Sequence, residues 1–126
     1  MKRVIIAVGA IIFTLAISFT GYFLVENSCN TLSSHLESIC KASQDNNLDD
    51  AIKKSEDAVK MWEDIHGLIE SFIRHEETDK LEELIKSLPV YAHQGNLERL
   101  EQQADLAIDE IAHLIRNEKP LISNIF

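Results

Sequence analysis

Glycine is scarce in this chain of 126 residues: there are four, and they are scattered rather than gathered in one loop. A phosphate-binding loop needs closely spaced glycines ahead of a helix, so the sequence gives no indication of a nucleotide site. It also lacks serine, histidine and acidic residues, or cysteine and histidine, at a spacing that suggests a catalytic triad. We therefore expect a protein that is not an enzyme and that needs no cofactor.

Cysteine is scarce too, with Cys29 and Cys40 as the only two. They lie in a segment with a helical pattern, which separates them by about 16 Å along the helix axis. A disulfide needs Cα atoms within about 7 Å, so these two cannot pair within one helix. We expect both to be small apolar packing residues, and the alternative is an intermolecular disulfide through Cys29.

Basic residues are outnumbered, with 12 against 21 acidic ones. Lys2 and Arg3 precede all the acidic residues, so the part after residue 25 has 10 basic and 21 acidic residues and a formal charge of −11. Such an acidic surface repels nucleic acid and anionic lipid headgroups, so we expect no nucleic-acid partner. A basic protein or a divalent cation fits this charge better.

A long apolar run, in contrast, is present: residues 4–25 read VIIAVGAIIFTLAISFTGYFLV, 22 residues without a charge. As a helix the run measures about 33 Å, enough to cross a bilayer core of about 30 Å, so it predicts an anchor in the lipid bilayer. Lys2 and Arg3 precede it, and the next basic residue is Lys41, which favours a cytoplasmic N-terminus and an extracytoplasmic remainder at the plasma membrane. The alternative, a cleaved signal peptide, usually has a shorter apolar core and a small-x-small site, which YFLVENS does not offer.

Beyond the anchor, apolar residues recur with a helical period and no stretch alternates as a strand does. The predicted fold is all-α, with an N-terminal cytoplasmic tip and transmembrane helix in residues 1–25. A small antiparallel three- to four-helix bundle with an apolar C-terminal tail follows in residues 26–126. The helices are expected from Leu48 to His75, from Thr78 with a kink or an early end at Pro89, and from Leu97 until Pro120 ends the order.

The same period predicts which residues face the core. Trp62 is expected to be the core anchor of the second helix. On the third helix the expected inward residues are Leu81, Leu84, Leu88 and Tyr91. On the fourth they are Leu97, Leu100, Ala104, Ala107, Ile108, Ile111 and Ile115.

Two Glu-x-x-His pairs, Glu63–His66 and Glu110–His113, resemble the ligands of di-metal carboxylate bundles. At about 100° per residue, His113 lies opposite the apolar stripe of its helix and faces solvent. His66 lies beside the stripe of its own helix, where a lone histidine is usually a hydrogen-bonded boundary residue. We expect no di-metal site.

The stretch FIRHEETD at residues 72–79 joins the second and third helices. Arg74 and His75 are expected to favour the negative end of the second helix, with Glu76 and Glu77 at the positive end of the third and Thr78 as its cap. The alternative is a cation site in which His75 binds a metal together with Glu76 or Glu77.

The Lys-Arg start, the single anchor, Trp62, FIRHEETD and the terminal SNIF together resemble the membrane-anchored family known as domain of unknown function 4363. The likeness covers the whole chain, and its most specific parts are His75 with Glu77 and the terminal Asn124 to Phe126. It implies an extracytoplasmic helical domain of a Gram-positive-type bacterium, and it implies no activity. Some members are encoded beside a multi-pass membrane protein, which implies such a partner. The chain departs from the family pattern at Arg74, Thr78 and Pro89.

We predict a non-enzymatic interaction module that docks on a membrane protein, or on itself as a homo-oligomer. The alternative is a cation- or metal-responsive sensor domain that uses the corner around His75. The second helix is long enough to bring its apolar end to the lipid headgroups. The apolar tail from Leu121 is expected to pack back on the bundle, or else to bind a partner. The candidate interaction residues are Trp62, Phe72, Ile73, His75, Glu77, Asn124, Ile125 and Phe126.

Overall fold

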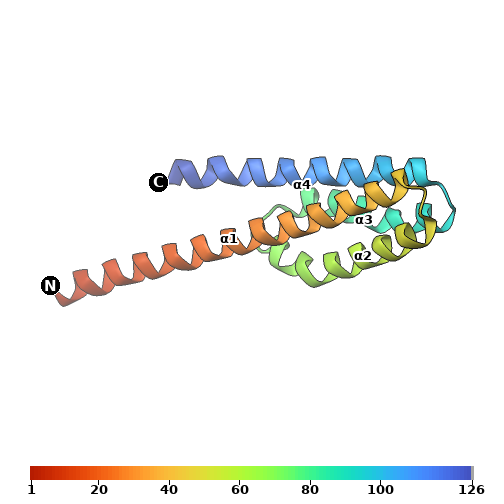
Figure 1. Cartoon of the computed structure of the whole chain (residues 1–126). Helices are drawn as coiled ribbons and strands as arrows, with labels where there is room; N and C mark the ends of the chain where they lie inside the picture. Colours follow the sequence, from red (N-terminus) through yellow and green to blue (C-terminus); the bar gives the residue numbers. More distant parts are fainter. Residues whose placement is uncertain (126) are drawn as a thin grey trace.

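Four α-helices make up the chain in the computed structural model, which describes the backbone of residues 1–125 and the side chains of residues 1–116. They are α1 (Lys2–Gln44), α2 (Leu48–Glu70), α3 (His75–His93) and α4 (Leu97–Ile125). No strand occurs among the described residues, and the predicted all-α class is confirmed. Figure 1 shows that α1 and α4 both extend past the corner between α2 and α3, on the same side of the molecule.

The helices pack as a ring, because α1 and α3 each contact both α2 and α4. The connections between them are short, since only residues 45–47, 71–74 and 94–96 separate one helix from the next. Short connections make consecutive helices antiparallel. The second half of α1 is therefore the first member of an antiparallel four-helix bundle, which the sequence predicted as three to four helices.

Buried side chains recur on every helix at alternating steps of three and four residues. This mean period of 3.5 residues gives each helix one narrow apolar seam, as in left-handed helical bundles. The seams contain Val25, Cys29, Leu32, Leu36 and Ile39 on α1, Ala51, Ser55, Ala58, Trp62 and Ile69 on α2, Thr78, Leu81, Ile85, Leu88 and Ala92 on α3, and Leu100, Ala104, Ala107, Ile111 and Leu114 on α4.

The environment of α1 changes at Gly21 without a break in the helix. Residues 1–20 are all exposed, and from Gly21 onward one face is buried against the bundle. This helix is long and apolar enough near its N-terminus to cross a membrane, as the sequence predicted. One helix thus connects the candidate span to the bundle.

The corner between α2 and α3 differs from the predicted one. α2 ends at Glu70 rather than at His75, and α3 begins at His75 rather than at Thr78. The buried side chain of Ile73 explains the early end, because the chain must turn inward to place it in the core. Thr78 is not a cap, since its hydroxyl lies inside the first turn of α3 and donates to the carbonyl of His75 at 2.9 Å.

The two prolines lie inside helices. α4 continues through Pro120 to Ile125, so the prediction that order ends at Pro120 was wrong. α3 continues through Pro89 for another turn, to His93. A proline removes one backbone donor, and on α3 this loss is offset by packing, because the seam residues that precede and follow it, Leu88 and Ala92, are fully buried.

Candidate functional site

The corner between α2 and α3 packs on α1 at the point where α1 leaves the bundle. The Phe72 ring lies so close to Gly21 that a Cβ atom at residue 21 would come within 2.7 Å of ring atom Cε1. Phe72 keeps 41% of its surface exposed, whereas the neighbouring Ile73 is buried. Glycine at residue 21 permits this close approach, which fixes the corner beside the exposed apolar half of α1.

Trp62 lies in the core, behind the surface of this corner. It is 1% exposed, and its indole N–H donates to Oε1 of Glu82 on α3 at 3.3 Å. This hydrogen bond, followed by one from Lys86, lowers the pKa of the Glu82 carboxyl. Trp62 therefore joins α2 to α3 and offers no surface to a partner.

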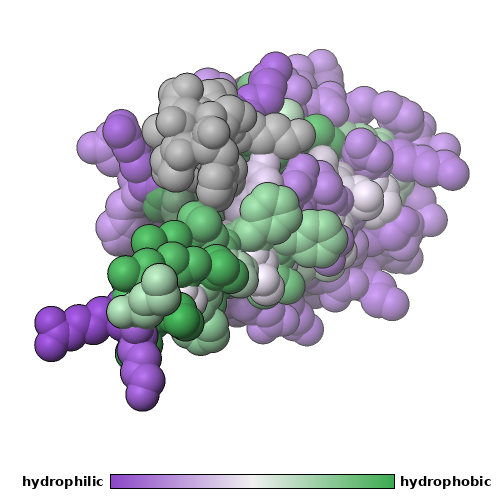
Figure 2. All heavy atoms as spheres, turned by 90° about the vertical axis from the view of Figure 1, so that its left-hand side faces the viewer, coloured by the Kyte–Doolittle hydropathy of each residue, from purple (hydrophilic) through white to green (hydrophobic). Residues whose placement is uncertain are grey.

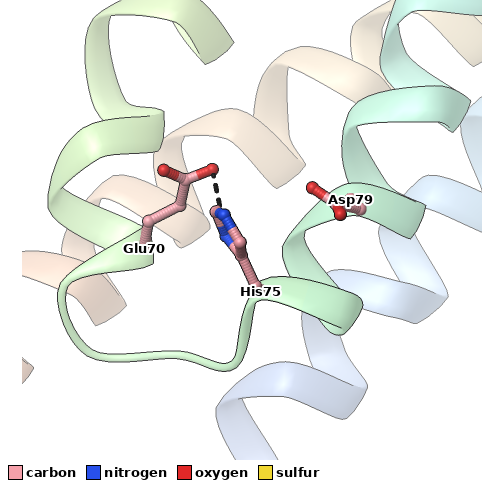
Figure 3. A group of neighbouring side chains, drawn as sticks. All are labelled: Glu70, His75 and Asp79. Carbon is pink, nitrogen blue, oxygen red and sulfur yellow. Dashed lines mark ion pairs between the residues drawn. The ribbon is translucent and has the colours of Figure 1, made fainter.

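The acidic neighbours of His75 are not the ones proposed from the sequence. Figure 3 shows the His75 ring with Glu70, from the end of α2, and with Asp79, one turn further along α3. His75 Nδ1 lies 3.7 Å from Glu70 Oε1. One ligand atom from each of the three residues lies within 4.8 Å of the others. Glu76 and Glu77 instead line a groove between α3 and α4. They follow His75 by one and two positions, and residues so spaced on a helix do not share a side.

Arg74 and His75 do not lie at the negative end of α2, where the sequence led us to expect them. Arg74 and His75 begin α3, and the last turn of α2 contains no basic residue. They therefore lie at the positive end of α3, where a bound cation is disfavoured. Glu76 and Glu77 are in the first turn of α3, as expected, and their charge is favourable there.

A groove of about 670 Å³ runs between α3 and α4 next to this corner. Charges of both signs border it, and Lys80 Nζ lies 3.5 Å from Glu110 Oε2. Leu106 is 50% exposed in the groove. Apolar surface is therefore open to solvent between charged side chains. The lining residues are Glu76, Glu77, Lys80, Leu84, Leu106, Asp109, Glu110, His113 and Arg116.

The structure does not bring the two Glu-x-x-His pairs together. Glu63 and His66 belong to α2, Glu110 and His113 belong to α4, and these two helices occupy opposite corners of the ring. His113 is exposed as predicted, whereas Glu110 has only 12% of its side chain exposed. His66 is the expected boundary residue, half-buried with Nδ1 2.9 Å from the carbonyl oxygen of Glu63.

Both cysteines are buried packing residues. Burial, and to a smaller extent Glu26, raises the pKa of Cys29 to about 11. The Cys40 thiol donates to Asp105 Oδ1 at 3.3 Å, and burial followed by this bond raises its pKa to about 12. Both thiols stay protonated at neutral pH, and an intermolecular disulfide through Cys29 would require the seam of α1 to open.

The candidate interaction residues of the tail are described only in part. Asn124 and Ile125 belong to the backbone of α4, while their side chains and the whole of Phe126 lie outside the described residues. The backbone of residues 121–125 continues α4 past the corner and does not turn back over the bundle (Figure 1).

Comparison with known proteins bears on the family and not on an activity. No curated protein and no solved structure matches the chain. The profile of a family described as a domain of unknown function, DUF4363, matches residues 19–125. This match includes the end of the exposed half of α1, the whole bundle and α4 to its last residue. The chain therefore belongs to the DUF4363 family.

Proposed function

We propose that this protein is a single-pass membrane protein whose four-helix bundle, outside the cytoplasm, is a non-enzymatic interaction module. The module docks on another membrane protein or on a second copy of itself. The continuity of α1 carries the proposal, because its first half is exposed and apolar and its second half is a full member of the bundle.

A helix shared by span and bundle restricts how the bundle can move. A flexible linker would let the bundle take many distances and orientations relative to the bilayer. A continuous helix advances 1.5 Å per residue and keeps the bundle at one height above the membrane. This arrangement suits a domain that presents one side to a neighbour in the same membrane.

The groove between α3 and α4 is the surface that we assign to docking. Interaction surfaces combine an apolar centre with a polar rim, and here Leu84 and Leu106 lie among charged side chains. Its volume of about 670 Å³ is large enough to accept several side chains of a partner.

Replacing Leu106 with arginine tests this assignment. We expect Leu106→Arg to break the complex, because a long charged side chain would occupy the open apolar part of the groove. Leu106 is 50% exposed, so stability should change by no more than about 0.5 kcal/mol. The measurement is cross-linking in native membranes, followed by the size of the tagged protein in mild detergent.

Val90→Arg is the matched control, because Val90 on α3 is 53% exposed and does not line the groove. We expect it to leave the cross-linked complex intact. If Leu106→Arg and Val90→Arg behave alike, the groove is not the docking surface.

A second function, that of a cation-responsive sensor, is favoured by one observation: Glu70, His75 and Asp79 offer three ligand atoms within 4.8 Å of one another. A carboxylate–imidazole set of this kind suits Zn²⁺, with water at the remaining position. Against it, His75 and Asp79 are exposed, and the first turn of α3 disfavours a cation.

Calorimetric titration of the full chain with Zn²⁺ separates the two functions. A sensor at this corner would show a dissociation constant on the order of micromolar, and the bound metal would raise the melting temperature. His75→Ala should abolish that binding, and Glu76→Ala, which faces the groove, should retain it. Identical titrations of the wild type and His75→Ala would exclude the sensor function at this corner.

A further inference from the structure

Helices α1 and α4 lie side by side in opposite directions, and two contacts define their register. The Cys40 thiol donates to Asp105 Oδ1 at 3.3 Å, and the Gln44 amide donates to Glu101 Oε1 at 2.8 Å. A step of four residues toward the C-terminus of α1 is thus matched by a step of four residues toward the N-terminus of α4.

The register persists toward the membrane-proximal end of the bundle. One cavity is lined by Asn30 and Ser33 of α1 and by α4 residues between Ile108 and Arg116, and it contains the pair that this register predicts: Asn30 lies ten residues before Cys40, and Ile115 lies ten residues after Asp105. The same stepwise match places Lys119 level with Glu26, since each is 14 residues from that pair.

This register reveals a shared charge boundary. Glu26 is the first charged residue after the apolar run of α1, and Lys119 is the last charged residue of α4. Because the two are level, both helices change from charged to uncharged sequence at one plane. Beyond it lie residues 4–25 of α1 and residues 120–125 of α4, neither of which contains a charge.

α4 is the helix that accompanies α1 in this direction, since both continue past the corner between α2 and α3 (Figure 1). Figure 2 looks at this end of the molecule. The apolar half of α1 stands out in green with hydrophilic residues at its tip, and hydrophilic side chains predominate around the bundle behind it. Phe72 from the corner reaches Gly21, on the uncharged side of the plane.

We infer that the end of α4, residues 120–125, enters the outer leaflet of the bilayer next to α1, so that two helices hold the bundle on the membrane. The inference rests on the proposed membrane span of α1. It identifies the partner of this uncharged helix end as the boundary between lipid headgroups and acyl chains.

The depth of α4 fits that boundary and not the centre of the bilayer. From Lys119 to Ile125 the helix advances about 9 Å, which is the depth at which interfacial helices lie. A single spanning helix can tilt in any direction, and a second insertion point beside it restricts the tilt of the bundle against the bilayer.

Tryptophans added at chosen heights test this inference in the full chain. Trp62 is the only native tryptophan and is 1% exposed in the core, so it contributes a constant background. Ile122→Trp is reconstituted in phosphatidylcholine vesicles whose acyl chains carry bromine close to the headgroup, and its loss of emission is measured against unbrominated vesicles. Phe23→Trp is the matched control, because Phe23 is level with Ile122 and is 63% exposed on α1. Gln102→Trp is the control for the charged side of the plane, because Gln102 is exposed on α4 within the bundle.

We expect Ile122→Trp to lose the same fraction of its added emission as Phe23→Trp, and Gln102→Trp to lose none. Quenching at residue 23 without quenching at residue 122 would overturn the inference and leave the span of α1 standing. Quenching at neither residue would overturn the proposed span and the inference together. If Ile122→Trp lowers the melting temperature, Ile125→Trp is used in its place. Thr20→Trp is then the matched control, because residue 20 of α1 is level with residue 125 of α4. The same results would support or overturn the inference.

Discussion

Replacing Trp62 with alanine is expected to destabilise the bundle by about 3–5 kcal/mol, the usual cost of removing a large buried aromatic side chain. Trp62 is 1% exposed and is the largest of the fully buried side chains. A small domain has about 5–15 kcal/mol of stability in total, so this single change removes a large share. Thermal unfolding of the full chain in detergent micelles, followed by circular dichroism, measures the loss. An unchanged melting temperature would contradict the buried position of Trp62.

Trp62→Phe separates the packing of the ring from its hydrogen bond. Phenylalanine keeps an aromatic ring but has no N–H group for Glu82, so we expect a smaller loss of about 1–2 kcal/mol. The pKa of Glu82 is lowered chiefly by this bond. The stabilisation from Glu82 is therefore present above its ordinary pKa of 4.5 and is lost as the pH falls through the lower folded-state value. Below about pH 5, the stability of Trp62→Phe should thus depend less on pH than that of the wild type.

Asn27→Pro is expected to destabilise the bundle by about 3 kcal/mol or more, because it breaks the helix that the candidate span and the bundle share. Asn27 lies inside α1, two residues after the buried Val25 and two before the buried Cys29, and its own side chain is exposed. Proline there removes one helical hydrogen bond and clashes with the carbonyl group four residues earlier. The melting temperature of the full chain in micelles reports the loss.

Asn27→Ala is the control for this substitution. It removes the same exposed side chain but keeps the backbone donor, so we expect a change within about 0.5 kcal/mol. Equal melting temperatures for Asn27→Pro and Asn27→Ala would show that α1 need not be continuous at this point, and would contradict a rigid connection between span and bundle.

The helices themselves could be predicted from the sequence because each seam is apolar at nearly every buried position. What the sequence could not predict is how deeply each apolar residue is buried. The period identifies the apolar side of each helix, but it does not show which of two adjacent apolar residues on that side lies deeper in the core. Of the residues predicted to face inward on α3 and α4, five are half-buried and pack against the core: Leu84, Tyr91, Leu97, Ile108 and Ile115. The adjacent residues Ile85, Ala92 and Leu114 are the fully buried ones.

The corner could not be predicted from local sequence, because its geometry depends on a residue in another helix. Ile73 is drawn into a core formed by all four helices, which ends α2 early and moves His75 to the start of α3. The contact between Phe72 and Gly21 joins residues far apart in the chain.

Polar contacts between helices were missed for the same reason. His35 Nε2 lies 2.9 Å from the carbonyl oxygen of Lys54 on α2, a contact that the helical period of α1 does not indicate. The bond from Cys40 to Asp105, which sets the register of α1 and α4, likewise has no local signal in the sequence.

The central claim, that α1 crosses the membrane and leaves the bundle outside, is tested most directly by labelling Asp49→Cys on intact cells with a membrane-impermeant maleimide. Asp49 is exposed at the start of α2, and the two native cysteines are buried, so the wild type gives a low background. We predict labelling before lysis, on protein that remains in the membrane fraction. Labelling only after lysis, or labelled protein released into the medium without its apolar N-terminal run, would contradict the account.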